Sequence, residues 1–122
     1  MSFGIALIES AISIHLHYCS YYRPDIKNLT AVWASLSDKQ PELLIKEMSP
    51  YISKLYTVDI FGSRAVPKQE LADMAKKYIA DSTAAESLEK AVTDAITSGE
   101  DLIVFGSLYL ASDARNIIIE KL

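Results

Sequence analysis

The sequence predicts a small α/β domain in three layers, with a mostly parallel sheet between two layers of helices. Three segments rich in aliphatic, β-branched and aromatic residues lie at residues 29–36, 54–60 and 101–107. Around them, apolar residues recur at intervals of three and four, which is the period of a helix with one buried face. Repeated strand–helix alternation produces right-handed crossovers onto a parallel sheet. We therefore expect a Rossmann-like arrangement in which residues 1–122 form a single domain.

The composition is that of an ordinary globular protein and excludes several other classes. The 122 residues are 50% hydrophobic and 23% charged, which excludes a disordered or collagen-like chain. One cysteine, Cys19, cannot form a disulfide within the chain. Lysine and arginine number 12 against 16 acidic residues, so the formal net charge is -4 and nucleic acid is not expected as a partner.

Membrane and secretory signals are also not expected. The longest apolar runs are far shorter than the roughly 18 residues that span a bilayer. The apolar residues 1–8 have no lysine or arginine before them, as a signal peptide would. Because the lone Cys19 fits a reducing compartment, we expect a cytoplasmic protein.

The first half of the chain is predicted to contain two helices and two strands. Residues 8–19 form a helix that Arg23 and Pro24 end, and the uncharged residues 29–36 form a strand buried on both faces. Ser37 or Asp38 caps the next helix, and residues 54–60 form the second strand. That second helix has Pro41 in its first turn, Pro50 at a bend or in its last turn, and an apolar stripe of Leu43, Leu44, Met48 and Ile52.

The second half is predicted to contain two successive helices, one strand and a final helix. No strand is expected between the two helices, of which the later is capped by Ser82 or Thr83 and closed by Gly99. Residues 101–107 form the third strand. Three strands are few for such a sheet, and the chain opens with a helix where a strand would be expected. We therefore expect the first strand of the fold to be missing and one sheet edge to be unpaired.

The candidate binding residues follow from the rule that ligands bind at the carboxyl ends of strands in open α/β sheets. Gly106 and Ser107 turn into a helix whose N-terminus favours an anion, although a plain helix cap is the simpler alternative. Arg64 is placed to hold a carboxylate or phosphate, or else is a solvated loop residue. Asp38 is placed to bind a ribose hydroxyl and Lys39 to meet a phosphate, although a helix cap at Asp38 is the simpler alternative.

No catalytic residue and no metal site are predicted. His15 and His17 lie two apart on a predicted helix and point about 200° away from each other, so they cannot share one ion. The sequence contains no Gly-Lys-Ser/Thr motif of the kind that binds ATP phosphates.

Three segments in order carry a resemblance to a known family. They are residues 29–39, ending in an Asp-Lys pair; residues 62–65, followed by Glu70 and Leu71; and residues 102–110, a strand running into Gly-Ser-Leu-Tyr. Together they resemble the C-terminal domain of folylpolyglutamate synthase and dihydrofolate synthase, in the Mur ligase superfamily. The resemblance covers nearly the whole chain from about Ile8.

The resemblance implies part of an ATP-dependent ligase of folate biosynthesis. In that family, ATP phosphorylates a pteroate or folate carboxylate, and the amino group of glutamate attacks the acyl phosphate. The P-loop and most magnesium ligands belong to an N-terminal domain, so ATP and magnesium belong to the parent family and neither is expected to be held by this chain alone. The expected partner is a separately encoded N-terminal P-loop domain.

The same resemblance implies places for the candidate residues and reveals one departure. Ser107 would lie near the glutamate or acyl-phosphate site, and Asp38, Lys39 and Arg64 would line the cleft. The family domain begins with a strand ending in Asp-Gly-Ala-His-Asn, positions that fall on residues 3–7 here. Only the glycine is kept: the Asp is replaced by a phenylalanine and the His by an alanine. We therefore expect a fragment or remnant that is inactive alone.

Other functions stay open. The first alternative is a non-catalytic small-ligand or protein-interaction domain derived from that ligase, and an exposed sheet edge would allow a homodimer. A flavodoxin-like or receiver-type domain ranks last, because Asp59 is followed by Ile60 and Phe61 rather than by an acidic cluster. The residues do not distinguish a dihydropteroate substrate from a folate that already bears glutamate.

Overall fold

The computed structural model describes residues 5–8, 28–98, 101–106 and 108–121. In these ranges the strands are β1 (Ile5–Ile8), β2 (Leu29–Trp33), β3 (Ile52–Thr57), β4 (Ser82–Ala84) and β5 (Leu102–Phe105). The helices are α2 (Pro41–Met48), α3 (Lys68–Ala75), α4 (Leu88–Ser98) and α5 (Leu108–Lys121), with short 3₁₀ helices η2 (Ser37–Lys39) and η3 (Ser49–Tyr51) on either side of α2.

The described strands form one parallel sheet in the order β1-β5-β2-β3-β4. Ala31 at the centre of β2 is in register with Ile103 of β5 on one side and Leu55 of β3 on the other. β2 is buried along its whole length, as a central strand covered on both faces must be. The predicted α/β class and mostly parallel sheet are confirmed.

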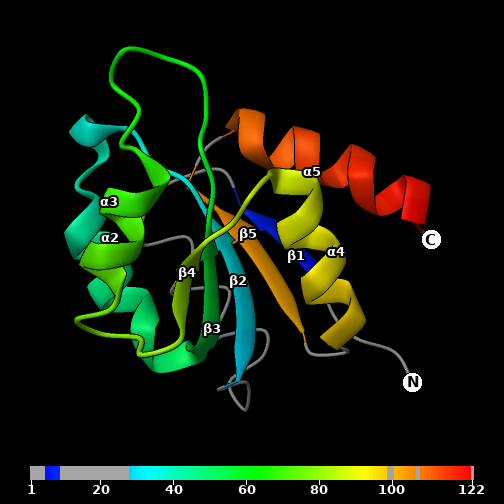
Figure 1. The fold of residues 1–122 in the computed structure, drawn as a ribbon, viewed down its shortest axis with the longest axis horizontal. Coiled ribbons are helices and arrows are strands. Elements are labelled where there is room, and N and C mark those ends of the chain that lie inside the picture. The colour runs from blue at the N-terminus through cyan, green and yellow to red at the C-terminus, as the bar shows by residue number, and fades with distance from the viewer. Residues whose placement is uncertain (1–4, 9–27, 99–100, 107, 122) are drawn as a thin grey trace.

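The three layers follow from the alternation of side chains along the central strands. Ala31 and Trp33 of β2 pack on one side with apolar residues of α2 and α3, while Val32 packs on the other with α4 and α5. Figure 1 shows the same division, with α2 and α3 to one side of the sheet and α4 and α5 to the other. Each fully buried large side chain, such as Ile45, contributes about 1.5–3 kcal/mol to this core.

The expectation that the first strand is missing is wrong. β1 pairs with β5 from Ile5 opposite Leu102 to Ile8 opposite Phe105, so β5 lies between β1 and β2. β5, which would be an edge strand without β1, is therefore paired on both sides. A run of four apolar residues is too short to distinguish a strand from the first turn of a helix. The sequence pattern therefore predicts a helix from residue 8. The remainder of the helix predicted over residues 8–19, its end at residues 23–24, and Gly99 lie outside the described residues.

The expectation of two helices without a strand between them is also wrong. β4 lies there and pairs with β3, and its Ser82 is buried, with its hydroxyl donating to the carbonyl of Ile79 at 2.7 Å. Three residues of small polar and apolar types leave no periodic pattern in the sequence. Because Ser82 belongs to β4, it does not cap α4; Ser87 does, accepting from the backbone N–H of Lys90 at 3.1 Å.

The predicted cap of the helix after β2 is also wrong, because the two candidate residues form a short helix of their own. Ser37 and Asp38 form η2, and Gln40 precedes α2 in the left-handed region at φ 50°, with no side-chain cap. Pro41 occupies the first turn as predicted. The buried face of α2 is made by Leu44, Ile45 and Met48, whereas Leu43 is 44% exposed and Ile52 starts β3.

Candidate functional site

The candidate site lies where the chain changes direction across the sheet. From β2 the chain moves outward through β3 to β4, and it then returns to β5 on the opposite side of β2. The carboxyl ends of β2 and β5 therefore lie side by side while the segments that follow them diverge. In open α/β sheets this is the point at which ligands bind.

Gly106 forms the turn at the end of β5. Its φ is 112°, a conformation that favours glycine, and a Cβ there would lie 1.8 Å from the carbonyl oxygen of Ala34. α5 begins two residues later, at Leu108, and runs for 14 residues, so its positive N-terminal end lies at the carboxyl edge of the sheet. Ser107, between them, lies outside the described residues.

The segment after β2 and the loop after β3 are bound to each other by backbone hydrogen bonds. Leu36 and Ala65 form an antiparallel bridge. Ser37 N–H donates to the carbonyl of Arg64 at 2.7 Å, and Val66 N–H donates to the carbonyl of Ser35 at 3.0 Å. These bonds bring two of the predicted site segments together at one edge, which the sequence could not show.

Asp38 and Arg64 form an ion pair across this junction, with Nη1 of Arg64 2.5 Å from Oδ2 of Asp38. Both side chains are largely exposed, at 65% for Arg64 and 45% for Asp38, so the pair contributes at most about 1 kcal/mol. The guanidinium has five N–H donors, and most of them stay available to a ligand. Lys39 is exposed at the end of η2 beside this pair.

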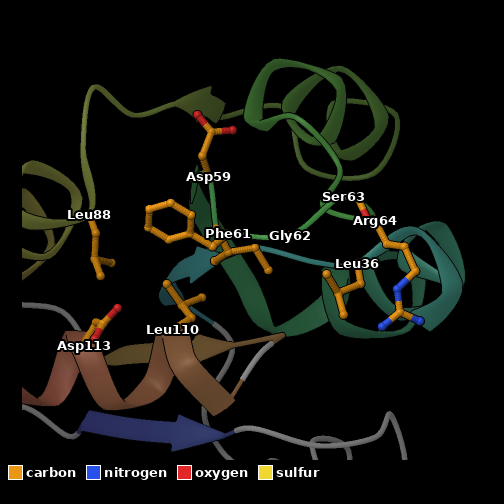
Figure 2. A pocket seen from close by; sticks show the side chains of 10 residues that line it. Leu36, Asp59, Phe61, Gly62, Ser63, Arg64, Leu88, Leu110 and Asp113 are labelled. Atoms are coloured by element: carbon orange, nitrogen blue, oxygen red, sulfur yellow. The ribbon is translucent and has the colours of Figure 1, made fainter.

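A cavity of about 590 Å³ opens beside the same loop. Figure 2 shows Leu36 and Arg64 at one end of it and Leu88 and Asp113 at the other. Of the four predicted site residues that the structure describes, Arg64 lines the cavity, whereas Asp38, Lys39 and Gly106 do not. The described lining residues are Leu36, Asp59, Ile60, Phe61, Gly62, Ser63, Arg64, Leu88, Leu110 and Asp113.

Sequence reasoning missed most of this lining. Leu88 and Leu110 have the apolar character of ordinary buried helix residues, and Asp113 lies one turn further along α5. The one signal in the sequence was Phe61, an aromatic residue in a loop beside a glycine; it is fully exposed. An exposed large apolar side chain at a cavity is more informative than a buried one.

The loop between β3 and α3 carries Phe61. Hydrogen bonds join the start of this loop to the first residue of α3. Oδ1 of Asp59 accepts from the backbone N–H of Lys68 at 2.9 Å, and Thr57 donates its hydroxyl to the Lys68 carbonyl at 2.7 Å. Nζ of Lys68 in turn donates to the carbonyls of Ala85 and Glu86, at 2.6 and 3.3 Å. The loop thus connects β3, α3 and the segment before α4.

Trp33 ends β2 directly beneath this edge. Its ring stacks on Phe105 with centroids 6.1 Å apart, and it is fully buried. Nε1 of Trp33 is buried and has no hydrogen-bond partner among the described residues. Buried N–H donors are rarely left unpaired, so this atom is unusual.

The parts of the chain that the structure describes contain no group of three or more His, Cys, Asp or Glu side chains that could hold a metal ion. No helix among them is both long enough and apolar enough to cross a membrane.

The fold and its switch point define a three-layer α/β domain with a parallel sheet and a carboxyl-edge site. Solved structures of folylpolyglutamate synthases share this fold. For the Mycobacterium tuberculosis enzyme complexed with ADP and AMPPCP, the TM-score is 0.78 at 18% identity, over 89% of this chain. For Escherichia coli FolC in complex with ADP, the TM-score is 0.76 at 15% identity, over 93% of this chain.

The bifunctional folylpolyglutamate synthase/dihydrofolate synthase from Yersinia pestis, complexed with AMPPNP and Mn ion, gives a TM-score of 0.72 at 17% identity over 97% of this chain. In all three comparisons this chain spans 28% of the solved chain. The predicted structural resemblance to folylpolyglutamate synthase is therefore confirmed at the level of the fold. No protein-family model matches the sequence, and no curated protein matches it.

Proposed function

We propose that this chain is the C-terminal part of a folate-type ATP-dependent ligase and works with a separately encoded P-loop domain. The observation that carries the proposal is the fold shared with folylpolyglutamate synthases over 89–97% of this chain but 28% of theirs. The three sequence segments that resemble the family also end at the carboxyl edge, where Asp38, Arg64 and Gly106 are found.

The proposed reaction joins glutamate to a pteroate or folate carboxylate. The γ-phosphoryl group of ATP passes to that carboxylate, giving an acyl phosphate and ADP. The glutamate nitrogen then attacks the acyl carbon and phosphate leaves, so that an amide bond replaces the acyl–phosphate bond. ATP and magnesium supply the activation, and the partner domain would hold the P-loop.

The residues of this chain fit a supporting role at the anionic groups of that reaction. Gly106 allows a tight backbone turn between β5 and α5, so that the N-terminus of α5 lies at the carboxyl edge of the sheet. A helix N-terminus favours a carboxylate or phosphate. Ser107 would add a hydroxyl donor beside it. Arg64 would exchange its exposed contact with Asp38 for a ligand anion at little cost in stability.

Calorimetric titration of the purified chain tests this role. We expect L-glutamate to bind weakly to the chain alone, Ser107→Ala and Arg64→Ala to weaken that binding further, and ADP and AMPPNP to bind only with the partner domain present. Gln69→Ala, an exposed change on α3 outside the cavity lining, is the control. Absence of L-glutamate binding by a folded chain would contradict the proposed role.

A second candidate function is a non-catalytic small-ligand domain derived from such a ligase. The observation that favours it is the 590 Å³ cavity, whose volume is typical of small-molecule sites. Its lining includes five described residues outside the three resembling segments: Asp59, Ile60, Phe61, Leu88 and Asp113. Ligand binding at this cavity without any contribution to glutamate ligation would favour this candidate.

A further inference from the structure

The cavity beside Phe61 has walls that are mainly apolar. Ile60 and Leu88 are half-buried there, and Leu110 is almost fully buried at its base. Phe61 is fully exposed, so its ring is free to lie against a ligand. A ligand for this cavity therefore needs an apolar body.

The charges of the lining are divided between its two ends. Arg64, the one cation among the lining residues, lies at the Leu36 end and is paired with Asp38. Asp113 lies at the other end, beside Leu88 (Figure 2). Asp59 lines the cavity too, on the same loop as Phe61 and two residues before it.

The two carboxylates have no cationic partner among the described residues. The ion pairs in that part of the chain join Arg64 to Asp38, Lys77 to Glu42, and Lys90 to Asp94. Asp59 accepts one hydrogen bond, from the backbone N–H of Lys68 at the start of α3, where the positive end of the helix dipole offsets part of its charge. Asp113 has no such compensation among the described contacts. The cavity therefore presents uncompensated negative charge next to apolar surface.

Negative charge, an exposed aromatic ring and apolar walls together define the ligand. A carboxylate attracts an ammonium group, and the face of a phenylalanine ring attracts the same cation. An anion would be repelled by Asp59 and Asp113 unless it displaced Asp38 from Arg64. This preference is opposite to that of the nucleotide, folate and phosphate groups in the proposed ligase reaction.

We propose that this cavity binds a small organic ammonium ion, with its charge at Asp113 and its apolar body against Phe61, Leu88 and Leu110. The carboxylate of Asp59 points away from these residues (Figure 2), so its attraction acts over a longer distance. The ligand charge is opposite to that of the anions proposed to bind at Gly106, Ser107 and Arg64, and Arg64 lies at the opposite end of the cavity from Asp113 (Figure 2). Binding of the ammonium ion does not depend on the chain being part of a ligase.

A charge series of one molecular shape tests the proposal on the full chain. The probes are 3-phenylpropylammonium, the neutral 3-phenylpropanol and the anionic 3-phenylpropionate, each followed by protein NMR at rising concentration. For such small probes we expect the ammonium ion to bind with a Kd on the order of 1 mM. We expect the alcohol to bind at least several-fold more weakly and the carboxylate not to bind. Equal or tighter binding of the alcohol or the carboxylate would overturn the proposal, and so would failure of the ammonium ion to bind.

Variants of the two carboxylates test whether each contributes to binding of the ammonium ion. Asp113→Asn removes an exposed charge that makes no described contact. We expect this change to weaken binding of the ammonium ion by about fivefold, as for the loss of a surface ion pair. Asp59→Asn keeps an oxygen acceptor for the Lys68 N–H and is expected to act in the same direction. Asp73→Asn on α3, an exposed Asp outside the lining, is the control and is expected to leave the affinity unchanged. Equal loss in Asp73→Asn and Asp113→Asn would show non-specific charge attraction and overturn the site.

The outcome is distinguishable from that of the ligase proposal. Ammonium binding is measured without ATP, glutamate or a partner domain. The ligase role is measured by anion binding and ligation, and its failure leaves the cation result unaffected.

Discussion

Gly106 and Ala34 meet through backbone alone: a Cβ on Gly106 would lie 1.8 Å from the carbonyl oxygen of Ala34 and 3.0 Å from its carbonyl carbon. Ala34 follows β2 and Gly106 follows β5, so this contact joins the two central strand ends at which the chain reverses across the sheet. It also holds the start of α5 at the edge where the candidate ligand residues gather.

Replacing this glycine is expected to be severe. Gly106→Ala combines a strained φ of 112° with a backbone clash that no side-chain movement relieves, so we expect a loss of about 3 kcal/mol or more. Gly62→Ala is the matched control, because its φ is 130° but the nearest atom to the new Cβ would be Leu36 Cδ2 at 3.9 Å. Strain alone is expected to cost about 1–2 kcal/mol there. Urea unfolding measures both, and equal losses would show that the contact with Ala34 is not tight.

Arg64→Ala separates binding from stability. Because the ion pair with Asp38 is exposed, its loss is expected to change the free energy of unfolding by less than about 1 kcal/mol. Thermal unfolding measures this, and Lys77→Ala, which removes the exposed pair with Glu42, is the control. A loss several times larger than that of Lys77→Ala would mean that Arg64 holds the β2 and β3 loops together.

Trp33 carries a donor that folding leaves unpaired. Trp33→Phe keeps an aromatic ring on Phe105 and removes Nε1, so we expect a cost of less than about 2 kcal/mol, whereas Trp33→Ala is expected to cost about 3–5 kcal/mol. Trp33 is the single tryptophan of the chain, so unfolding is followed by circular dichroism. Equal costs for the two variants would indicate that Nε1 has an acceptor in solution.

Tyr78 makes stability depend on pH at the alkaline end. Its hydroxyl donates to Oε2 of Glu42 at 2.9 Å, and this hydrogen bond raises the pKa of Tyr78 above its ordinary value of 10.0. The folded state therefore binds the phenol proton more tightly than the unfolded state. This contribution to stability is complete below the ordinary pKa and is lost as pH rises through the folded pKa.

Absorbance titration of the phenolates checks this prediction. One of the seven tyrosines is expected to titrate late in the native protein, and Tyr78→Phe or Glu42→Gln is expected to remove that late step. Persistence of the same late step in Tyr78→Phe would assign it to another tyrosine.

The fold was predictable where segments are long and apolar. Residues 29–36 and 101–107 have the uncharged character of buried strands, and they form β2 and β5 at the centre of the sheet. β1 and β4 were not predictable, because four and three residues leave no period and their pairing with β5 and β3 is decided by tertiary contact.

The contacts of the candidate site were not predictable. The rule for strand ends predicts that Asp38, Arg64 and Gly106 lie at one edge of the sheet, where the structure has them, and their binding role stays a prediction. The pairing of Asp38 with Arg64 spans 26 residues and depends on the Leu36–Ala65 bridge, which no local pattern encodes. The cavity combines side chains from a loop and two helices, so its lining required the tertiary structure.

Glutamate ligation in the presence of a P-loop domain bears most directly on the proposed function. The chain is mixed with the N-terminal part of a folylpolyglutamate synthase, and ATP-dependent addition of labelled glutamate to dihydropteroate or a folate is measured. We expect no addition by either part alone, addition by the mixture, and a loss of activity with Arg64→Ala but not with Gln69→Ala. A domain encoded beside this chain is the preferred partner. Addition by this chain alone, or no addition by a mixture in which the two parts form a complex, would contradict the proposal.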